Sequence, residues 1–212
     1  QSSLNSNAYS SNPYGRSDLQ TIARWIPDGS RVLDLGCGNG DFLKTLKQEK
    51  RVTGYGIELD AEKVANCVAS GVNVIQTNLD QGLADFDSDS FDYVVLSLTL
   101  QAVHRPRLLL QEMLRVGQHG IVTFPNFAHW RNRLQIALSG QMPVSKQLPH
   151  KWYNTPNIHL CTIKDFKVLC EELGIKIDTF VALNSNDNDS APISILPNLL
   201  GEIALTKFSK KT

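Results

Sequence analysis

Apolar positions along the chain recur with two periods, one typical of buried strands and one typical of amphipathic helices. Short aliphatic and β-branched runs predict strands, and apolar residues three or four positions apart predict helices. Up to position 124 the predicted strands are 31–36, 52–58, 73–77, 91–98 and 120–124, and the predicted helices are 18–25, 41–47, 61–69 and 106–115. Because short strands and helices alternate, the pattern predicts an α/β fold with a mostly parallel sheet and helices on both faces.

The second part of the chain has a different pattern. Its predicted helices are 128–138 and 163–173, and its predicted strands are 175–183 and 199–208. Between the two helices, residues 139–160 contain three prolines and show no clear period; long irregular segments of this kind often form lids or binding loops. We therefore expect one domain over 16–212 with a lobe inserted at about 126–160, a disordered tail over 1–15 and a mobile surface loop over 184–190.

A glycine-rich turn follows the first predicted strand, in the sequence Val32-Leu-Asp-Leu-Gly-Cys-Gly-Asn-Gly40. Glycine allows a tight turn and a close approach of a ligand to the main chain, and the helix that follows offers free N–H groups. In an open α/β sheet this edge is where ligands bind. The G-x-G-x-G spacing disfavours a dinucleotide-binding oxidoreductase, whose G-x-G-x-x-G motif would need glycine where this chain has Asp41. A tight turn without a ligand is the alternative.

Two carboxylates accompany this turn. Asp34 lies two residues before the first glycine, where an acid suits a ligand with a positive charge. Glu58 ends the second predicted strand, 20 residues after Gly38, where a carboxylate can accept both hydroxyls of a ribose. The alternative for Glu58 is a solvated strand end.

Three glycines between two placed acids resemble class I S-adenosylmethionine-dependent methyltransferases over about 31–124. The two late strands are similar to the closing hairpin of that family, so the resemblance implies a Rossmann-like sheet of seven strands with a C-terminal antiparallel hairpin. It also implies S-adenosylmethionine or S-adenosylhomocysteine as the ligand. The implied ligand contacts are Asp34, Gly36, Cys37, Gly38, Gly40, Glu58, Leu59, Asn78, Leu79, Asp80 and Ser97.

One position departs from the methyltransferase pattern. The family has an acid after the third strand that bonds the adenine amino group, and this chain has Asn78 there. An amide oxygen can still accept such a bond. Asp80 is the alternative, either as a substitute for that acid or as the cap of a turn.

Further stretches resemble one family in particular, the bacterial methionine-biosynthesis proteins called MetW, over about 16–207. They include Trp25-Ile-Pro, Val52-Thr-Gly-Tyr-Gly-Ile-Glu58, Leu100-Gln-Ala-Val-His104, Thr123-Phe-Pro-Asn-Phe127, Trp152-Tyr-Asn-Thr-Pro-Asn-Ile-His159 and Pro197-Asn-Leu-Leu-Gly-Glu202. This resemblance implies a methyltransferase fold, a role in methionine biosynthesis and a complex with a homoserine O-acyltransferase as partner.

Composition narrows the possible classes further. The chain has 21 Lys and Arg against 21 Asp and Glu, which argues against a general nucleic-acid binder. It has no apolar run of the ~20 residues that a membrane helix needs, and its polar N-terminus lacks the apolar core of a signal peptide. Its four cysteines form no C-x-x-C pair, so we expect no metal site, reduced thiols and a cytoplasmic location.

Although the net charge is zero, the charged residues are distributed unevenly along the chain. No acid lies between Glu112 and Asp165, whereas Asp85, Asp87, Asp89 and Asp92 form an acidic stretch. The acid-free segment holds four of the five His and the basic residues Arg115, Arg131, Arg133, Lys146, Lys151 and Lys164. Basic clusters attract anionic ligands and complementary surfaces, although an ordinary solvated face is the alternative. Its aromatic residues Trp130, Trp152 and Tyr153 are typical either of interfaces or of a core.

A few side chains are candidates for catalysis, and His129, Tyr153 and His159 are the weaker ones. His104, just after the fourth predicted strand, is the best-placed candidate for a catalytic base, with a structural histidine as the alternative. The Asn/Asp-Pro-Pro-aromatic signature of amino-group methyltransferases does not occur, because Asn126 follows Pro125. We therefore favour a partner or regulatory subunit of the acyltransferase, whose cofactor site senses methionine supply. An active methyltransferase acting on a small molecule is the alternative.

Overall fold

The structure, a computed structural model, describes residues 14–184 and 192–211. Within these residues one sheet of seven strands has the order β3-β2-β1-β4-β5-β7-β6. The strands are β1 (Arg31–Leu35), β2 (Thr53–Glu58), β3 (Val74–Gln76), β4 (Phe91–Ser97), β5 (Gly117–Pro125), β6 (Ile175–Leu183) and β7 (Ile203–Lys210). β1 to β5 pair in parallel, and β7 runs antiparallel to both β5 and β6. The predicted mostly parallel sheet with a C-terminal antiparallel hairpin is confirmed.

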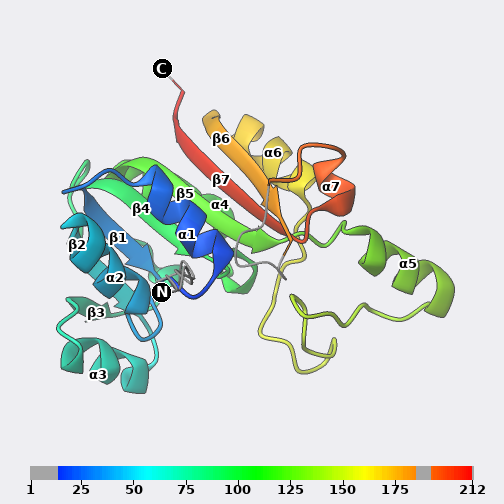
Figure 1. Ribbon diagram of the computed structural model, residues 1–212, viewed down its shortest axis with the longest axis horizontal. Helices are drawn as coiled ribbons and strands as arrows, with labels where there is room; N and C mark the ends of the chain where they lie inside the picture. Colours follow the sequence, from blue (N-terminus) through cyan, green and yellow to red (C-terminus); the bar gives the residue numbers. More distant parts are fainter. Residues whose placement is uncertain (1–13, 185–191, 212) are drawn as a thin grey trace, which may run out of the picture.

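Helices cover both faces of this sheet (Figure 1). They are α1 (Ser17–Trp25), α2 (Asp41–Lys50), α3 (Ala61–Ala69), α4 (Pro106–Val116), α5 (Trp130–Ser139), α6 (Ile163–Glu172) and α7 (Pro197–Leu200), with short 3-10 helices η1 (Leu79–Gln81) and η2 (Leu100–Ala102). Local sequence sets several of the helix starts. Asp60 accepts N–H bonds at the start of α3, and Thr162 forms a capping box with Asp165 at the start of α6. Among the described helices, none is long and apolar enough to cross a membrane.

The core has two layers because successive strand residues point to opposite faces. Leu33 and Leu96 pack in the layer that includes α4 and α6, whereas Val32 and Val95 pack with Ile22 of α1 in the other. Since both faces are covered, the central strands are apolar at nearly every position.

Some predicted boundaries were wrong. β5 begins at Gly117, three residues earlier than predicted. The strand predicted from 199 begins at Ile203, because Pro197 opens the short helix α7 and its fixed φ suits a first helical turn. Residues 1–13 and 185–191, on which the predictions of a tail and a mobile loop mainly rest, lie outside the described residues.

The segment from 126 to 160, called the lobe from here on, leaves the sheet after β5. It comprises α5 and the irregular stretch that follows, and Figure 1 shows both extending away from the sheet. Its two ends meet where the backbone N–H of Phe127 donates to the carbonyl oxygen of Cys161 at 3.0 Å. The lobe is therefore an excursion that starts and ends at one place on the fold.

Candidate functional site

The glycine-rich turn lies at the carboxyl end of β1, next to β2. The N–H groups of Gly36 and Cys37 both donate to the carbonyl oxygen of Ile57, at 2.8 and 3.0 Å. Gly36 has φ +72°, and a Cβ there would approach the Thr99 hydroxyl at 3.0 Å. Glycine is thus required both by the left-handed backbone and by the close approach of the segment after β4.

Glu58 is held across this turn by the main chain. One carboxylate oxygen accepts from the N–H of Gly38 at 2.9 Å, and the other accepts from Leu59 and Asp60 at 2.9 and 3.0 Å. These bonds fix the carboxylate at the carboxyl end of β2. Each carboxylate oxygen has two lone pairs, so one acceptor position remains for a ligand hydroxyl at the oxygen that Gly38 bonds.

A cleft of about 430 Å³ opens in front of these residues. Seven of the predicted ligand residues line it, namely Gly36, Gly38, Glu58, Leu59, Asn78, Leu79 and Asp80. Thr99 and His104 line the same cleft from the segment after β4. Residues that are far apart in the sequence therefore meet where the sequence predicted a binding site.

Two other predicted ligand residues lie behind the turn. The Cys37 thiol faces Cys67, with their sulfurs 3.9 Å apart, and burial raises its pKa so that it stays protonated. Gly40 is buried as the N-cap of α2, where a Cβ would meet the Cys67 sulfur at 3.0 Å. All four cysteines of the chain are free thiols. Cys37 and Gly40 thus shape the turn from the side opposite the cleft.

Asp34 is buried at the carboxyl end of β1. Burial raises the pKa of this carboxyl to about 7; the charge of Arg16 opposes the shift and that of Glu58 adds to it. Removal from water favours the neutral acid. A positively charged group brought beside Asp34 would favour the ionised form, so the position suits a cationic ligand.

Asp80 and His104 form a pair at one end of the cleft. The two carboxylate oxygens of Asp80 bond the backbone N–H and the ring Nδ1 of His104, at 2.8 and 2.7 Å. Burial acts to raise the pKa of Asp80, but the hydrogen bonds from His104 outweigh it and hold the pKa below its ordinary value. Asn78 accepts the N–H of Asp80 at 2.9 Å and so caps η1. Asp80 is therefore engaged with His104, an arrangement that the sequence did not predict.

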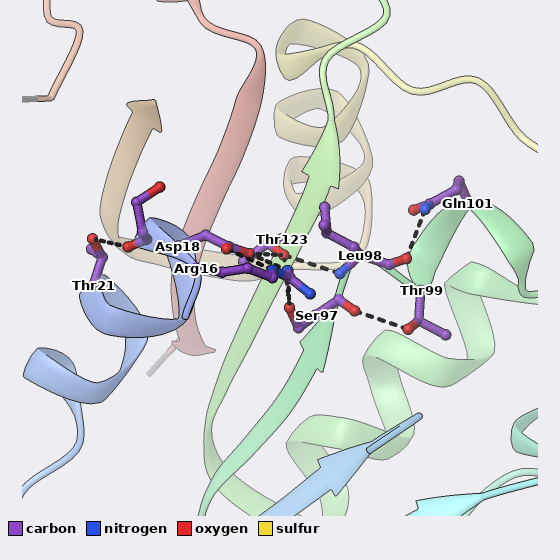
Figure 2. Close-up of polar contacts among 9 residues, drawn as sticks. Arg16, Asp18, Thr21, Ser97, Leu98, Thr99, Gln101 and Thr123 are labelled. Atoms are coloured by element: carbon purple, nitrogen blue, oxygen red, sulfur yellow. Dashed lines mark hydrogen bonds and ion pairs between the residues drawn. The ribbon is translucent and has the colours of Figure 1, made fainter. Parts of the chain in front are cut away.

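Arg16 was not among the predicted ligand residues, yet it lies beside the strand ends that carry them. Its guanidinium forms an ion pair with the buried Asp18 and donates to the Ser97 hydroxyl at 2.9 Å (Figure 2). Thr123 extends the same cluster, since its hydroxyl lies 3.3 Å from that of Ser97 and accepts from the N–H of Leu98 at 3.0 Å. The cluster fastens the start of α1 to the carboxyl ends of β4 and β5.

The place of Arg16 makes it a candidate anion contact. Asp18 is buried, whereas the Arg16 side chain is 44% exposed, and its charge acts on Asp34. A ligand that carries both a cation and a carboxylate would find opposite charges here. The available signal in the sequence was an Arg and an Asp two residues apart at the start of an amphipathic helix.

Within the described ranges, no three His, Cys, Asp or Glu side chains are grouped so that they could hold a metal ion. The cleft is lined instead by carboxylates and by the side chains of Lys63, Thr77, Asn78, Thr99 and His104, next to the backbone N–H groups of the turn. This is a set suited to an organic ligand with several polar groups.

Several solved structures with the same fold are named as S-adenosylmethionine-dependent methyltransferases. One from Thermotoga maritima, described as a possible histamine N-methyltransferase, has a TM-score of 0.66 and 18% identity, covering 92% of this chain and 88% of that one. One from Mesorhizobium loti has a TM-score of 0.67 and 19% identity, covering 91% and 98%. The fold is therefore that of the class I S-adenosylmethionine-dependent methyltransferases.

The family can be stated more closely. The model of the family described as "Methionine biosynthesis protein MetW" matches residues 16–208, and the chain belongs to this family. A relative from Rhodopirellula baltica, named a bifunctional methionine biosynthesis protein MetXA/MetW, is 37% identical over 203 residues. The match covers 92% of this chain and 33% of the relative, so the chain spans about one third of that protein's length.

Proposed function

We propose that this protein is the partner subunit of a homoserine O-acyltransferase in methionine biosynthesis, and that its cleft binds S-adenosylmethionine or S-adenosylhomocysteine as a signal of methionine supply. The observation that carries this proposal is the relative named MetXA/MetW, in which we take the MetXA part to be the acyltransferase. Joining two proteins raises their effective concentration for each other, which favours a pair that works in contact. The four free cysteines are typical of a reducing compartment, so the proposed location is the cytoplasm.

Side chains along the carboxyl ends of β1 to β4, in and beside the cleft, fit the charges of such a ligand. Asp34 suits a cationic group, Arg16 suits a carboxylate, and Glu58 has acceptor capacity left for a hydroxyl. The order of strands spreads these groups along the sheet edge, since Asn78 follows β3, Glu58 ends β2, Asp34 lies in β1 and Ser97 ends β4. The proposed ligand would therefore lie along this edge with its base near Asn78 and its amino-acid end near Arg16.

Ligand binding is tested by calorimetry with S-adenosylmethionine, S-adenosylhomocysteine and NAD. We expect binding of the first two only, and a weakening of about tenfold or more in Asp34→Asn and Glu58→Gln, because each variant removes a charge that the ligand would bond. Asp28→Asn, at an exposed acid before β1, is the matched control. Absence of S-adenosylmethionine binding, or unchanged affinity in both cleft variants, would refute the proposed site.

The partnership is tested with the purified homoserine O-acyltransferase of the same organism. We expect a complex in size-exclusion chromatography and a change in the acylation rate when this chain is added, with a further change when S-adenosylmethionine is present. No complex together with an unchanged rate would reject the proposal.

Methyl transfer is a second candidate function, favoured by the Asp80–His104 pair. S-adenosylmethionine supplies an activated methyl group when bound. Asp80 holds Nδ1 of His104, which leaves Nε2 as the atom that would accept a proton from an acceptor substrate. However, Asp80 follows β3, whereas Asp34 and Arg16 lie toward β1 and β4. His104 would therefore lie near the base end of the proposed ligand, which makes catalysis the second choice.

The second candidate is tested by incubating the protein and a small-molecule extract of the same cells with methyl-labelled S-adenosylmethionine. Label transfer that His104→Gln reduces in kcat, with an altered pH profile, would support a catalytic base. Transfer that His104→Gln leaves unchanged would exclude that role for His104.

A further inference from the structure

α5 presents its apolar side chains to solvent in the described fold. Of its ten residues only Asn132 is buried. Its apolar side chains are exposed, among them Trp130 at 41%, Leu134 at 47% and Leu138 at 78%. Most of a helix's stability in proteins comes from packing an apolar face. A helix with this exposure is therefore typical of a surface that another molecule covers.

The stretch after α5 extends this apolar surface. Trp152 and Tyr153 are 75% and 64% exposed, and their rings meet edge to face at 5.7 Å. They line a recess of about 570 Å³ together with Gly140, Gln141, Met142, Val144 and Lys151. The structure thus excludes a core position for these two aromatic residues, one of the two roles that the sequence left open. Exposed apolar patches of this kind mark interaction sites, and exposed Trp and Tyr are typical anchors of an interface.

The charge of the lobe restricts what can cover it. The lobe contains Arg131, Arg133, Lys146 and Lys151 and no Asp or Glu. A second copy docked lobe to lobe by twofold symmetry would bring two basic surfaces together. The complementary surface is therefore an apolar centre surrounded by acidic groups on a different protein.

We propose that the lobe is the docking surface for the homoserine O-acyltransferase, with Trp152, Tyr153 and Leu138 as apolar anchors and the four basic side chains facing acidic groups on the enzyme. The proposal rests on the proposed function and names the surface that carries it. The family match spans 16–208, so the lobe is part of the family's common sequence. Binding through an exposed excursion also leaves the cleft, on the edge of β1 to β4, open to its ligand.

The test measures the dissociation constant between the purified acyltransferase and four variants. Trp152→Ala combined with Tyr153→Ala removes the aromatic anchors, and Arg131→Glu combined with Lys151→Glu reverses charge at the same surface. The matched controls are Tyr55→Ala, an aromatic residue 44% exposed on β2, and Lys44→Glu, an exposed lysine on α2. We expect both lobe variants to weaken binding about tenfold or more and both controls to leave it unchanged.

The outcomes separate the two proposals. Thermal midpoints and S-adenosylmethionine affinity should stay at their wild-type values in all four variants, because the altered side chains are exposed. A wild-type complex that the lobe variants do not weaken would overturn the docking surface and leave the proposed function standing. Failure of the wild-type chain to bind the acyltransferase would overturn both. If the lobe variants instead convert a dimer of this chain into a monomer, the surface joins copies of this chain and the docking proposal is wrong.

Discussion

The cleft and the lobe differ in how far their side chains are held by contacts within the fold. In the cleft, Glu58 and Asp80 are held by hydrogen bonds from within the fold, and Arg16 is held in the same way at the N-cap of α1. In the lobe, α5 has no side-chain cap and buries one residue, and the aromatic side chains after it are exposed. The contrast shows that one region is organised by its own packing and the other presents its apolar groups outward.

The two regions meet at one short element. Thr99 and Ala102, beside and within η2, line the cleft. The carbonyl oxygen of Gln101 in η2 accepts the backbone N–H groups of Ile158 and His159, at 2.7 and 3.0 Å. A ligand in the cleft would therefore touch the element to which the end of the lobe is bonded.

The largest difference between core and lobe should appear in stability. Phe166 is buried on α6 against Phe124, with ring centroids 5.0 Å apart. We expect Phe166→Ala to lower the free energy of unfolding by about 3–5 kcal/mol, because it leaves a cavity. Trp152→Ala should change it by less than about 0.5 kcal/mol. Urea denaturation of both variants measures this, and an equal loss would show that the lobe is packed like the core.

The second prediction concerns the pH dependence of ligand binding in the cleft. Because Asp34 has a pKa of about 7 and a cationic ligand needs the ionised form, affinity for S-adenosylmethionine should rise about tenfold per pH unit up to about pH 7 and then level off. Asp34→Asn should weaken binding and remove this dependence. Calorimetry across the pH range measures it; a flat wild-type profile would contradict the raised pKa.

The Asp34 carboxyl should also make stability depend on pH, in the direction opposite to ligand affinity. The unfolded carboxyl titrates near its ordinary pKa of 3.8, so between about pH 4 and pH 7 the unfolded state binds fewer protons than the folded state. The free energy of unfolding of the ligand-free protein should therefore fall as pH rises through this window. Asp34→Asn should lack this decrease, which urea denaturation at a series of pH values will show.

A smaller effect should link the two regions. If η2 transmits ligand binding to the lobe, S-adenosylmethionine should change the affinity for the acyltransferase by about fivefold or more, and the enzyme should change the affinity for the ligand by the same factor. Calorimetry of each partner with and without the other measures both. Two independent affinities would show that the cleft and the lobe act separately.

Salt concentration should produce the smallest difference between binding at the lobe and binding in the cleft. Between about 50 and about 500 mM salt, binding to the acyltransferase should weaken several-fold, mainly through a slower association rate, because the basic groups of the lobe are exposed and screened. Ligand binding in the cleft should change less, since Asp34 is buried. Interferometry follows the first and calorimetry the second, and equal salt dependence would remove the electrostatic part of the contrast.

Much of the cleft was predictable because its signals are local. The alternation of strands and helices predicted the sheet, and the three glycines between Asp34 and Glu58 predicted the turn and its edge. Seven of the eleven predicted ligand residues line the cleft. The other four do not: Asp34 and Ser97 lie within β1 and at the end of β4. Gly40 and Cys37 are directed toward Cys67 by the same left-handed turn that places Gly36 and Gly38 at the cleft.

The sequence by itself determined the order of elements, the edge of the sheet that carries the glycine-rich turn, and the uneven distribution of charge, because these follow from periodicity, turn residues and composition. Tertiary structure alone decided that Arg16 reaches Ser97, that Asp80 holds His104, and that Trp152 and Tyr153 are exposed. The first two join residues 81 and 24 positions apart. Such pairings depend on which strand ends lie side by side, and exposure depends on what packs against a segment, so neither is encoded in a local pattern.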